Sequence, residues 1–371
     1  MERKPLTRRQ FVRNSALTTA GIAAGLGTNA CTPKPPATDQ AAVEKTRSYN
    51  PNMQYRRLGK TGLWVSAVCL GGHWKRINKV IAAKGKISPY NSPGQKADLD
   101  SFYRNRDEVV SRCMAVGINC IDLAGDSEAE VYCKVLGDRR KHMFLAYSHP
   151  ASELRVPANR KASKLVELFE KGLQRCHIDY ADVWRLMALE RGGRHTQAES
   201  EEMIKALDIA RTRGLCRYTG FSTHDRKWAK MLIETYPEVV QVVIFPYTVK
   251  SKVLPHDSLF DAIKKHDVGT LGIKPFASNA LFKGDGSPNH PQAEADDQRA
   301  RMVLRYILCN SAITAPIPGL ISTHQVDNAA QAVRERREFD LTEKAELQRI
   351  ADETWAALPN DYQWLKDWEY V

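Results

Sequence analysis

The stretch that decides the fold lies between residues 182 and 244, where short apolar runs alternate with amphipathic segments. The apolar runs are DVWRL at 182–186, CRYTGFS at 216–222 and VVQVVI at 239–244. Between them, residues 199–213 and 225–236 carry apolar side chains at helical spacing. Short apolar strands that alternate with helices indicate βαβ units and a parallel sheet, because parallel strands are buried on both faces.

The same alternation continues on both sides of this stretch. Further strands are predicted at residues 67–70, 120–122, 143–147, 270–274 and 314–317, and further helices at residues 106–117, 127–136, 160–176, 257–267, 296–310 and 322–336. Eight such units in about 270 residues fit a closed (β/α)₈ barrel, an α/β fold. The alternative is a doubly wound open sheet, but the G-x-G-x-x-G turn that usually follows its first strand does not occur.

A hairpin and three long connections frame the predicted barrel. Residues 53–58 and 63–66 flank Gly59-Lys60-Thr61-Gly62 and are predicted to form an N-terminal β-hairpin. The long connections cover residues 73–105, 188–198 and 277–295, and each of them follows a strand. In a barrel they would therefore gather at the C-terminal face, where active sites lie.

The composition is that of an ordinary globular protein with a basic excess. Of the 371 residues, 43% are hydrophobic and 26% are charged, which argues against a disordered or fibrous chain. No run of about 18 apolar residues occurs, so the sequence does not predict a membrane-spanning segment. The net charge of +12 raises nucleic-acid binding as a hypothesis, supported by the basic residues Lys75 to Lys86 in the first long connection.

The first 30 residues predict an export signal of the twin-arginine type. Thr7-Arg8-Arg9-Gln10-Phe11-Val12-Arg13 supplies a basic region, and residues 16–27 are mildly apolar. Thr28-Asn29-Ala30 precedes Cys31, which leaves simple cleavage and lipidation of Cys31 both open. Loss of these residues removes five basic and one acidic side chain, so the charge becomes 12 − 4 = +8. Residues 31–52 are expected to be a linker or tether, residues 53–371 the barrel, and the location periplasmic or membrane-anchored.

The eight cysteines predict buried free thiols. Six of them, Cys69, Cys120, Cys133, Cys176, Cys216 and Cys309, lie within or beside apolar runs, where cysteine acts as a small hydrophobic residue. No C-x-x-C pair occurs, so the sequence predicts no iron–sulfur or structural zinc site and no metal.

Several motifs resemble those of the aldo-keto reductases. They include the hairpin residues 55–66 (YRRLGKTGLWVS), then GINCID at 117–122, GFST at 220–223, GIKPF at 272–276 and APIPG at 315–319. The resemblance covers residues 53 to 340 in the family's order. It implies a (β/α)₈ barrel that moves a hydride between NADP(H) and a carbonyl compound or an alcohol.

The resemblance is incomplete where the family keeps its catalytic Tyr, Lys, His and Asp. The Asp matches Asp122, but Asp126 and Ser127 occupy the region of the Tyr, and Ser148 and Met187 replace the Lys and the His. A tyrosine needs a cationic neighbour to act as an acid near neutral pH, so the usual mechanism should fail. The sequence offers a substitute set at predicted strand ends, with Asp122, Tyr147 and His149 as the candidate catalytic residues and His73 and Arg185 nearby.

The cofactor side of the resemblance is better preserved. Ser222 and Gln241 match the positions that hold the nicotinamide carboxamide, with Thr223 in place of the usual Asn. The segment that wraps the pyrophosphate is matched by Lys274, Ser278 and Asn279. The region that contacts adenosine and its 2′-phosphate is matched by Gly319, Ser322, Gln325 and Asn328. Helix N-termini favour phosphate, which supports this placement. The resemblance thus implies NADP, tightly bound if the protein is exported.

Three functions remain open from the sequence. The first is an exported oxidoreductase of this family with an altered catalytic set. The second is a catalytically degenerate barrel that binds a small anionic or sugar-like ligand at the same face. The third, nucleic-acid binding, is disfavoured because export removes the usual partners, so a small-molecule substrate is expected. The aromatic C-terminal residues Trp355, Tyr362, Trp364, Trp368 and Tyr370 are expected either to pack on the barrel wall or to shape the pocket.

Overall fold

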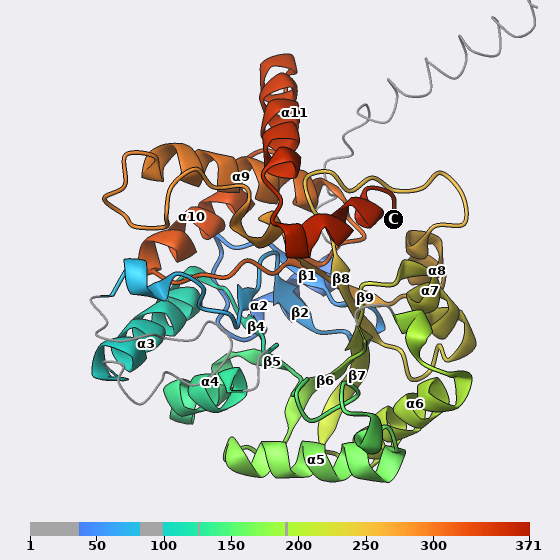
Figure 1. Cartoon of the computed structure of the whole chain (residues 1–371). Coiled ribbons are helices and arrows are strands. Elements are labelled where there is room, and N and C mark those ends of the chain that lie inside the picture. Colours follow the sequence, from blue (N-terminus) through green and yellow to red (C-terminus); the bar gives the residue numbers. More distant parts are fainter. Residues whose placement is uncertain (1–36, 82–98, 125–126, 190–191) are drawn as a thin grey trace, which may run out of the picture. The chain divides into compact units, whose positions relative to one another are not determined.

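A parallel sheet of eight strands lies at the centre of the computed structural model, which describes residues 37–81, 99–124, 127–189 and 192–371 (Figure 1). The strands of this sheet are β3 (Leu70–Gly71), β4 (Cys120–Asp122), β5 (Phe144–Tyr147), β6 (Ala181–Met187), β7 (Cys216–Ser222), β8 (Val242–Pro246), β9 (Gly269–Ile273) and β10 (Ala315–Pro316). Each strand pairs in parallel with the next one along the chain. All eight predicted strands are therefore present.

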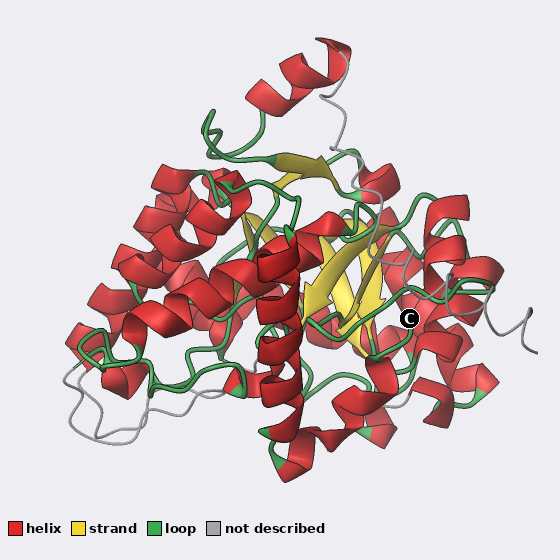
Figure 2. Cartoon of the chain, turned by 90° about the horizontal axis from the view of Figure 1, so that it is seen from above, coloured by secondary structure: helices red, strands yellow, loops and turns green. Residues whose placement is uncertain are grey.

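Two hydrogen bonds join the first strand to the last and close the barrel. The N–H of Cys69 donates to the carbonyl of Pro316 (3.0 Å), and the N–H of Gly71 donates to the carbonyl of Pro318 (2.8 Å). Gly71 also forms a parallel bridge to Gly319. Seen from above, the strands lie within a ring of helices (Figure 2). The predicted (β/α)₈ barrel is confirmed.

In the described part of the chain, each of the eight strands is followed by a helix. These helices are α3 (Leu99–Val116), α4 (Glu128–Leu136), α5 (Ala162–Arg175), α6 (Gln197–Thr212), α7 (Arg226–Thr235), α8 (Leu259–Lys265), α9 (Ala293–Cys309) and α10 (Thr323–Arg334). Their apolar faces explain their positions: α5 buries Leu165, Val166, Phe169 and Leu173. Helix α6 begins at a capping box, in which Thr196 accepts from the N–H of Glu199 and Glu199 accepts from the N–H of Thr196.

The predicted hairpin closes the end of the barrel at which the strands begin. Its strands β1 (Tyr55–Arg57) and β2 (Trp64–Ser66) are antiparallel. Gly59 has a φ of +49°, and a Cβ there would lie 2.2 Å from the amide nitrogen of Gly269. Only glycine fits this contact. Leu58 and Val65 from the hairpin join Val183 and Ile244 in the apolar cluster that fills the barrel.

The segment before the hairpin packs on the barrel, although residues 31–52 were predicted to be a linker. Helix α2 (Ala37–Glu44) buries Val43 in the core. Arg47 donates to Asp182 (2.9 Å), and Thr46 donates to the carbonyl of Trp64 (2.6 Å). The prediction rested on composition alone, which cannot show that single polar side chains find buried partners. The predicted signal and Cys31 lie outside the described residues.

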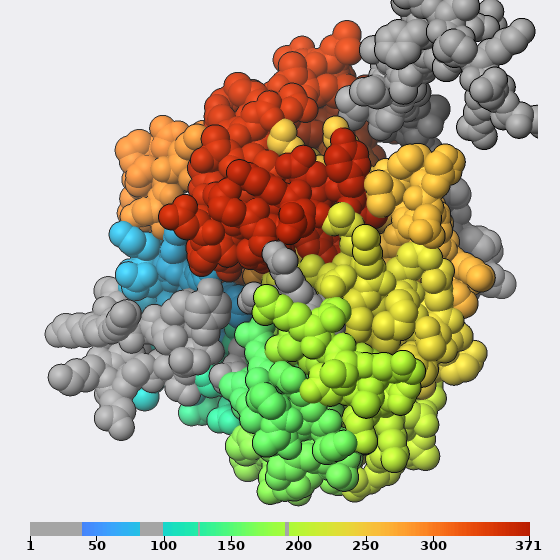
Figure 3. Space-filling model, turned by 45° about the vertical axis from the view of Figure 1, so that its right-hand side comes forward, coloured from blue at the N-terminus to red at the C-terminus, as the bar shows by residue number. Residues whose placement is uncertain are grey.

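The C-terminal residues also pack against the loop that follows β8. After α11 (Leu341–Ala356), a 3-10 helix, η8 (Asn360–Trp368), leads to the C-terminus. The N–H of Lys252 donates to the carbonyl of Glu369 (2.8 Å), and the N–H of Val371 donates to the carbonyl of Lys252 (2.8 Å). Figure 3 shows this C-terminal part in red, between the orange and yellow parts of the surface.

Three negative observations apply to the described ranges. No helix within them is long and apolar enough to cross a membrane. They also contain no group of three or more His, Cys, Asp or Glu residues arranged for a metal. The seven cysteines within them are free, and all are buried except Cys309, which is exposed although it was predicted to be buried.

Candidate functional site at the carboxyl ends of the strands

A buried ion pair forms the floor of the site. Asp122 ends β4, and Arg185 projects from β6 to donate from Nε to the Asp122 carboxylate (2.8 Å). Arg185 also donates to Ser222 Oγ (3.0 Å) at the end of β7 and to the carbonyl of Leu123 (3.2 Å). Burial raises the pKa of Asp122, and the charge and hydrogen bond of Arg185 oppose that rise. Arg185, on β6, thus links β4 and β7 beneath the opening.

A histidine paired with a buried glutamate forms one wall. His73 follows β3, and its Nδ1 is bonded to the carboxylate of Glu128 at the start of α4. The second Glu128 oxygen accepts the N–H of Ala124 (2.7 Å). A Cβ at Gly72 would lie 2.2 Å from that oxygen, so the chain needs glycine at this position. The glutamate fixes the orientation of the His73 ring beside the ion pair.

These groups surround a cavity of about 680 Å³ at the carboxyl ends of the strands. Its lining includes His73, Asp122, Arg185, Ser222, Thr223 and Lys274 from the barrel, and Tyr362 and Trp364 from the C-terminal segment. A cavity at this end of a parallel barrel is the usual position of an active site.

The loop after β9 is strained at the edge of this cavity. Lys274, Ala277, Ser278 and Asn279 all have positive φ values, from +45° to +71°. Each such residue other than glycine costs about 1–2 kcal/mol, so the loop is held by its surroundings. Backbone N–H groups in turns of this kind form concave sites for anions. With the Lys274 ammonium beside them, these residues suit a phosphate group.

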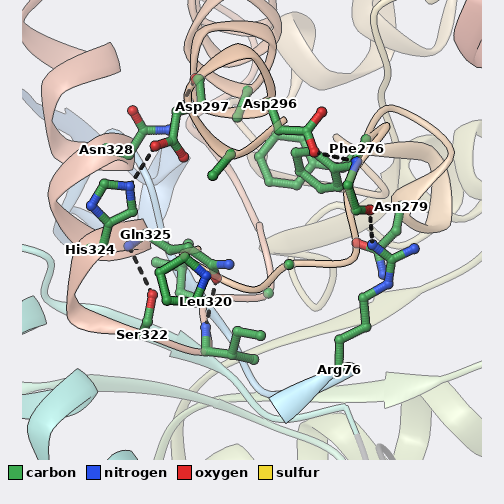
Figure 4. Close-up of a pocket in the computed structure, with 18 of the residues that line it drawn as sticks. Arg76, Phe276, Asn279, Asp296, Asp297, Leu320, Ser322, His324, Gln325 and Asn328 are labelled. Atoms are coloured by element: carbon green, nitrogen blue, oxygen red, sulfur yellow. Dashed lines mark hydrogen bonds and ion pairs between the residues drawn. The ribbon is translucent and has the colours of Figure 1, made fainter. Parts of the chain in front are cut away.

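A second, narrower pocket of about 100 Å³ lies at the start of α10 (Figure 4). Ser322 caps the helix by accepting the N–H of Gln325 (3.2 Å), and Gln325 accepts the N–H of Ile321 (2.9 Å). Asn328 accepts from Arg301 (2.6 Å) and donates to the carbonyl of Asp297 (3.1 Å). These bonds leave the helix N-terminus facing the pocket with its partial positive charge.

The two pockets are neighbours that share part of their lining. Lys75, Phe276, Asn279 and Gly319 belong to both. Across the second pocket, Arg76 donates to the carbonyl of Gly284 (3.1 Å). Together the pockets form a trough from the barrel mouth, over the strained loop, to the start of α10.

The C-terminal segment covers one side of the mouth. Trp364 stacks on His224 with ring centres 3.9 Å apart, and Trp368 donates to the carbonyl of His224 (3.1 Å). Burial, with Lys274 and Arg155 nearby, lowers the pKa of His224 to about 3, so this imidazole is neutral. Burial by itself raises the pKa of Tyr362, but Lys274, Ser278 and Lys75 together lower it to about 8.

The trough contains most of the residues predicted from the sequence. Around the mouth lie Asp122, Ser222, Thr223, Lys274, Ser278, Asn279 and Gly319, and around the second pocket lie Ser322, Gln325 and Asn328. They come from separate strands, loops and helices that only the closed barrel brings together.

Tyr147 is not at the mouth. It ends β5, but its side chain points outward into the layer beneath α5, where its hydroxyl would lie 2.0 Å from a Cβ on Gly172. Burial raises its pKa. Successive strand residues face opposite sides of a sheet, so a position at the strand end does not decide whether the side chain faces the cavity.

Gln241 and His149 also lie outside the lining of the trough. Strand β8 begins at Val242, later than predicted, so Gln241 stands at its amino end, where it accepts the N–H of Thr219 (3.1 Å). Ile244 takes a place in the cavity wall instead. In the loop after β5, His149 is bonded through Nδ1 to Ser152 Oγ (2.6 Å).

Two features of the mouth were not identified as site residues. Lys75 was treated as part of a basic loop, and Tyr362 as part of an aromatic tail. The two residues are far apart in the sequence, but in the fold the Lys75 ammonium lies 3.4 Å from the Tyr362 hydroxyl. The aromatic-rich tail was the only signal for Tyr362.

Comparison with known proteins agrees with this architecture. An L-galactose dehydrogenase of Arabidopsis thaliana is 23% identical over 333 residues, which cover 82% of this chain and 97% of that protein. The aldo-keto reductase AKR11C1 from Bacillus halodurans, in its holo form, superposes with a TM-score of 0.55 at 21% identity, over 80% of this chain and 96% of its own. An aldo-keto reductase from Klebsiella pneumoniae in complex with NADPH superposes with a TM-score of 0.59 at 18% identity. The superposition covers 80% of this chain and 95% of that one.

The sequence profile of the Aldo/keto reductase family matches residues 94–352, which is more than half of the chain. The matched region contains strands β4 to β10 and most of the residues of the trough. The protein is therefore a member of the aldo/keto reductase family.

Proposed function

We propose that this protein is an NADP(H)-dependent oxidoreductase that interconverts a carbonyl compound and an alcohol with an altered set of catalytic residues. The observation that carries the proposal is the trough, which joins a polar mouth to a helix N-terminus through a strained, cationic loop. A dinucleotide has the same sequence of parts: a polar ring, a diphosphate and an adenosine. The NADPH named with the Klebsiella relative supports this choice of cofactor.

Each part of the trough fits one part of the cofactor. Ser222 and Thr223 would hold the nicotinamide amide, and Lys274 with the loop around Ser278 would hold the diphosphate. Ser322, Gln325 and Asn328 would bind the adenosine end. When bound, the nicotinamide would supply or accept the hydride. Arg76 and His324 are cationic or ionisable groups beside the second pocket, suited to a 2′-phosphate.

The residues of this chain would have to stabilise the charges that are present or develop during that transfer. Arg185 orients Ser222 and neutralises Asp122, which would otherwise be an uncompensated buried charge. The carbonyl oxygen gains negative charge during reduction, so a donor above this floor is required. The named relative that acts on L-galactose supports a sugar-like substrate.

The test is direct binding and turnover. We expect the purified protein to bind NADPH, measured by nucleotide fluorescence, and Lys274→Ala to weaken that binding about tenfold. Lys366→Ala, an exposed lysine in the same half of the molecule, is the matched control. Turnover is then followed with L-galactose and related aldoses plus NADP⁺. Absence of NADPH binding in the unmodified protein would contradict the proposal.

We also propose export through the twin-arginine pathway, with a tightly held cofactor that travels inside the folded protein. The support is the Arg8-Arg9 motif and the Cys31 that follows a small-residue site. Arg8→Lys with Arg9→Lys should keep the protein in the cytoplasm. Mass spectrometry of the native exported protein would reveal a lipid on Cys31 and any retained nucleotide.

A second candidate is a catalytically degenerate barrel that binds a small anionic or sugar-like ligand. It is favoured by Ser148 and Met187, which replace two reactive family residues with groups that do not exchange protons near neutral pH. Ligand binding without hydride transfer to or from added NADP(H) would support this candidate over the first.

A further inference from the structure

The mouth of the barrel needs a proton donor, and one tyrosine is in a position to serve. Among the described residues that line the 680 Å³ cavity at the mouth, Tyr362 is the only tyrosine. It belongs to η8, on the C-terminal segment, and not to any of the barrel strands. Its side chain lines the cavity, and because it is half-buried it is partly protected from water.

Two lysines from separate loops converge on Tyr362. The Lys75 ammonium lies 3.4 Å from the hydroxyl and 3.3 Å from Ser278 Oγ. The ammonium of Lys274 lies 5.3 Å from the centre of the Tyr362 ring, and so does that of Lys75. Nearby positive charge favours the phenolate, and it outweighs burial to bring the pKa of Tyr362 to about 8. A group with a pKa near the working pH is suited to exchange protons.

The position of Tyr362 is fixed by contacts of the residues that follow it in the chain. Trp364 stacks on His224, and the buried Trp368 donates to the carbonyl of the same residue. Beyond them, the main chain of Glu369 and Val371 is hydrogen-bonded to Lys252. The C-terminal segment therefore holds the tyrosine at the mouth, as a catalytic group requires.

We propose that Tyr362 is the proton donor and acceptor of this site, with Lys75 and Lys274 as positioning residues that favour its ionised form. This inference rests on the proposed oxidoreductase function. In the oxidation direction, the alcohol O–H proton would pass to the Tyr362 phenolate. The hydrogen on the carbon that bears the hydroxyl would leave as a hydride, which the oxidised nicotinamide would accept when bound, and a C=O bond would form. In reduction, the tyrosine returns the proton to the oxygen.

Other groups around the cavity compete for this role or influence it. The charged and titratable ones are Lys75, Lys274, Arg155, Arg185, His73, His224, Asp122 and Asp361. His224 stays neutral, and Asp122 is paired with Arg185. His73, bonded to Glu128, is the strongest competitor. The two lysines would also attract phosphate, so the experiment must separate catalysis from nucleotide binding.

The experiment compares Tyr362→Phe with Tyr370→Phe, which alters an exposed tyrosine of the same segment. Both are assayed with L-galactose and related aldoses at saturating NADP⁺, and NADPH affinity is measured separately by fluorescence. We expect kcat of Tyr362→Phe to fall by about 10²–10⁴, while its NADPH affinity stays within about twofold of the unmodified protein. Tyr370→Phe should match the unmodified protein in both measurements.

A pH series supplies the second readout. Oxidation should increase as Tyr362 loses its proton near pH 8, and this rise should vanish in Tyr362→Phe and shift upward in Lys75→Met. If the unmodified protein turns over but Tyr362→Phe retains its kcat, or loses only NADPH affinity, the assignment of Tyr362 is wrong and the oxidoreductase function stands. If the unmodified protein transfers no hydride, the proposed function itself fails, and this inference fails with it.

Discussion

At the scale of single residues, Glu153 shows how burial changes the pKa of a carboxylic acid. Its side chain is buried, and one carboxylate oxygen accepts from Trp184 (3.2 Å). The other has no hydrogen-bond partner among the described residues. Burial raises the pKa of Glu153 to about 7, against hydrogen bonds and the charge of Arg185 that lower it. Below about pH 7, the neutral acid is therefore the favoured form in the folded protein.

This raised pKa predicts a pH-dependent stability. In the unfolded chain, Glu153 has its ordinary pKa of 4.5, so the native state binds the proton more tightly. Its contribution is complete below that pH and is lost as the pH rises through about 7, a change of about 3 kcal/mol. In Glu153→Gln, the free energy of unfolding measured with denaturant should not show this decline between pH 4.5 and 7. Glu201→Gln, an exposed control, should retain it, and an equal decline in both variants would contradict the assignment.

Tyr147 was predicted from the sequence to be catalytic, but its position in the structure indicates that it is not. Its buried hydroxyl lacks a hydrogen-bond partner among the described residues, and it faces α5. Removing an unsatisfied buried hydroxyl is neutral or stabilising, by about 1 kcal/mol. Tyr147→Phe should thus unfold at the same or a higher denaturant concentration, with unchanged kcat. A hundredfold loss of kcat would restore Tyr147 as a catalytic candidate.

At the scale of elements, the C-terminal segment depends on its last three residues. Two hydrogen bonds link Glu369 and Val371 to Lys252, a third joins Leu254 to Val371, and the Val371 side chain is fully buried. Deleting residues 369–371 should cost about 4 kcal/mol from lost hydrogen bonds and apolar burial. It should also lower kcat, because Tyr362 loses its support. Thermal unfolding and turnover test this, with Tyr370→Ala as the control for the exposed side chain.

The elements themselves differ in how well the sequence predicts them. Strands such as β6 and β7 are buried along their length, so their apolar runs are unambiguous. Helix α11 was missed because its surface is mostly polar, although Asp340 and Glu343 form a capping box that marks its start. The contact between Lys75 and Tyr362 could not be predicted, because no local sequence pattern indicates a contact between residues so far apart in the chain.

At the scale of the whole molecule, the boundary of the folded unit lies before the hairpin. The described residues, from Ala37 onward, belong to one compact unit. Within it, Arg47 reaches the buried Asp182, which also binds Arg140 (2.9 Å). Asn50 donates its main-chain N–H to the Tyr55 hydroxyl (2.8 Å). The sequence placed this boundary at residue 53, because a segment rich in Pro, Thr and Ala is typical of a linker.

Two truncations therefore should behave differently. A protein that begins at Ala37 keeps these contacts and should unfold with the free energy of the full chain. One that begins at Met53 loses the packing of Val43 and the bonds of Arg47, so it should be less stable by about 3 kcal/mol. Asp182 keeps its bond to Arg140, which limits the loss of stability. Arg47→Met in the protein that begins at Ala37 should reproduce about half of that loss. Equal denaturant midpoints for the two truncations would show that residues 37–52 are only a tether.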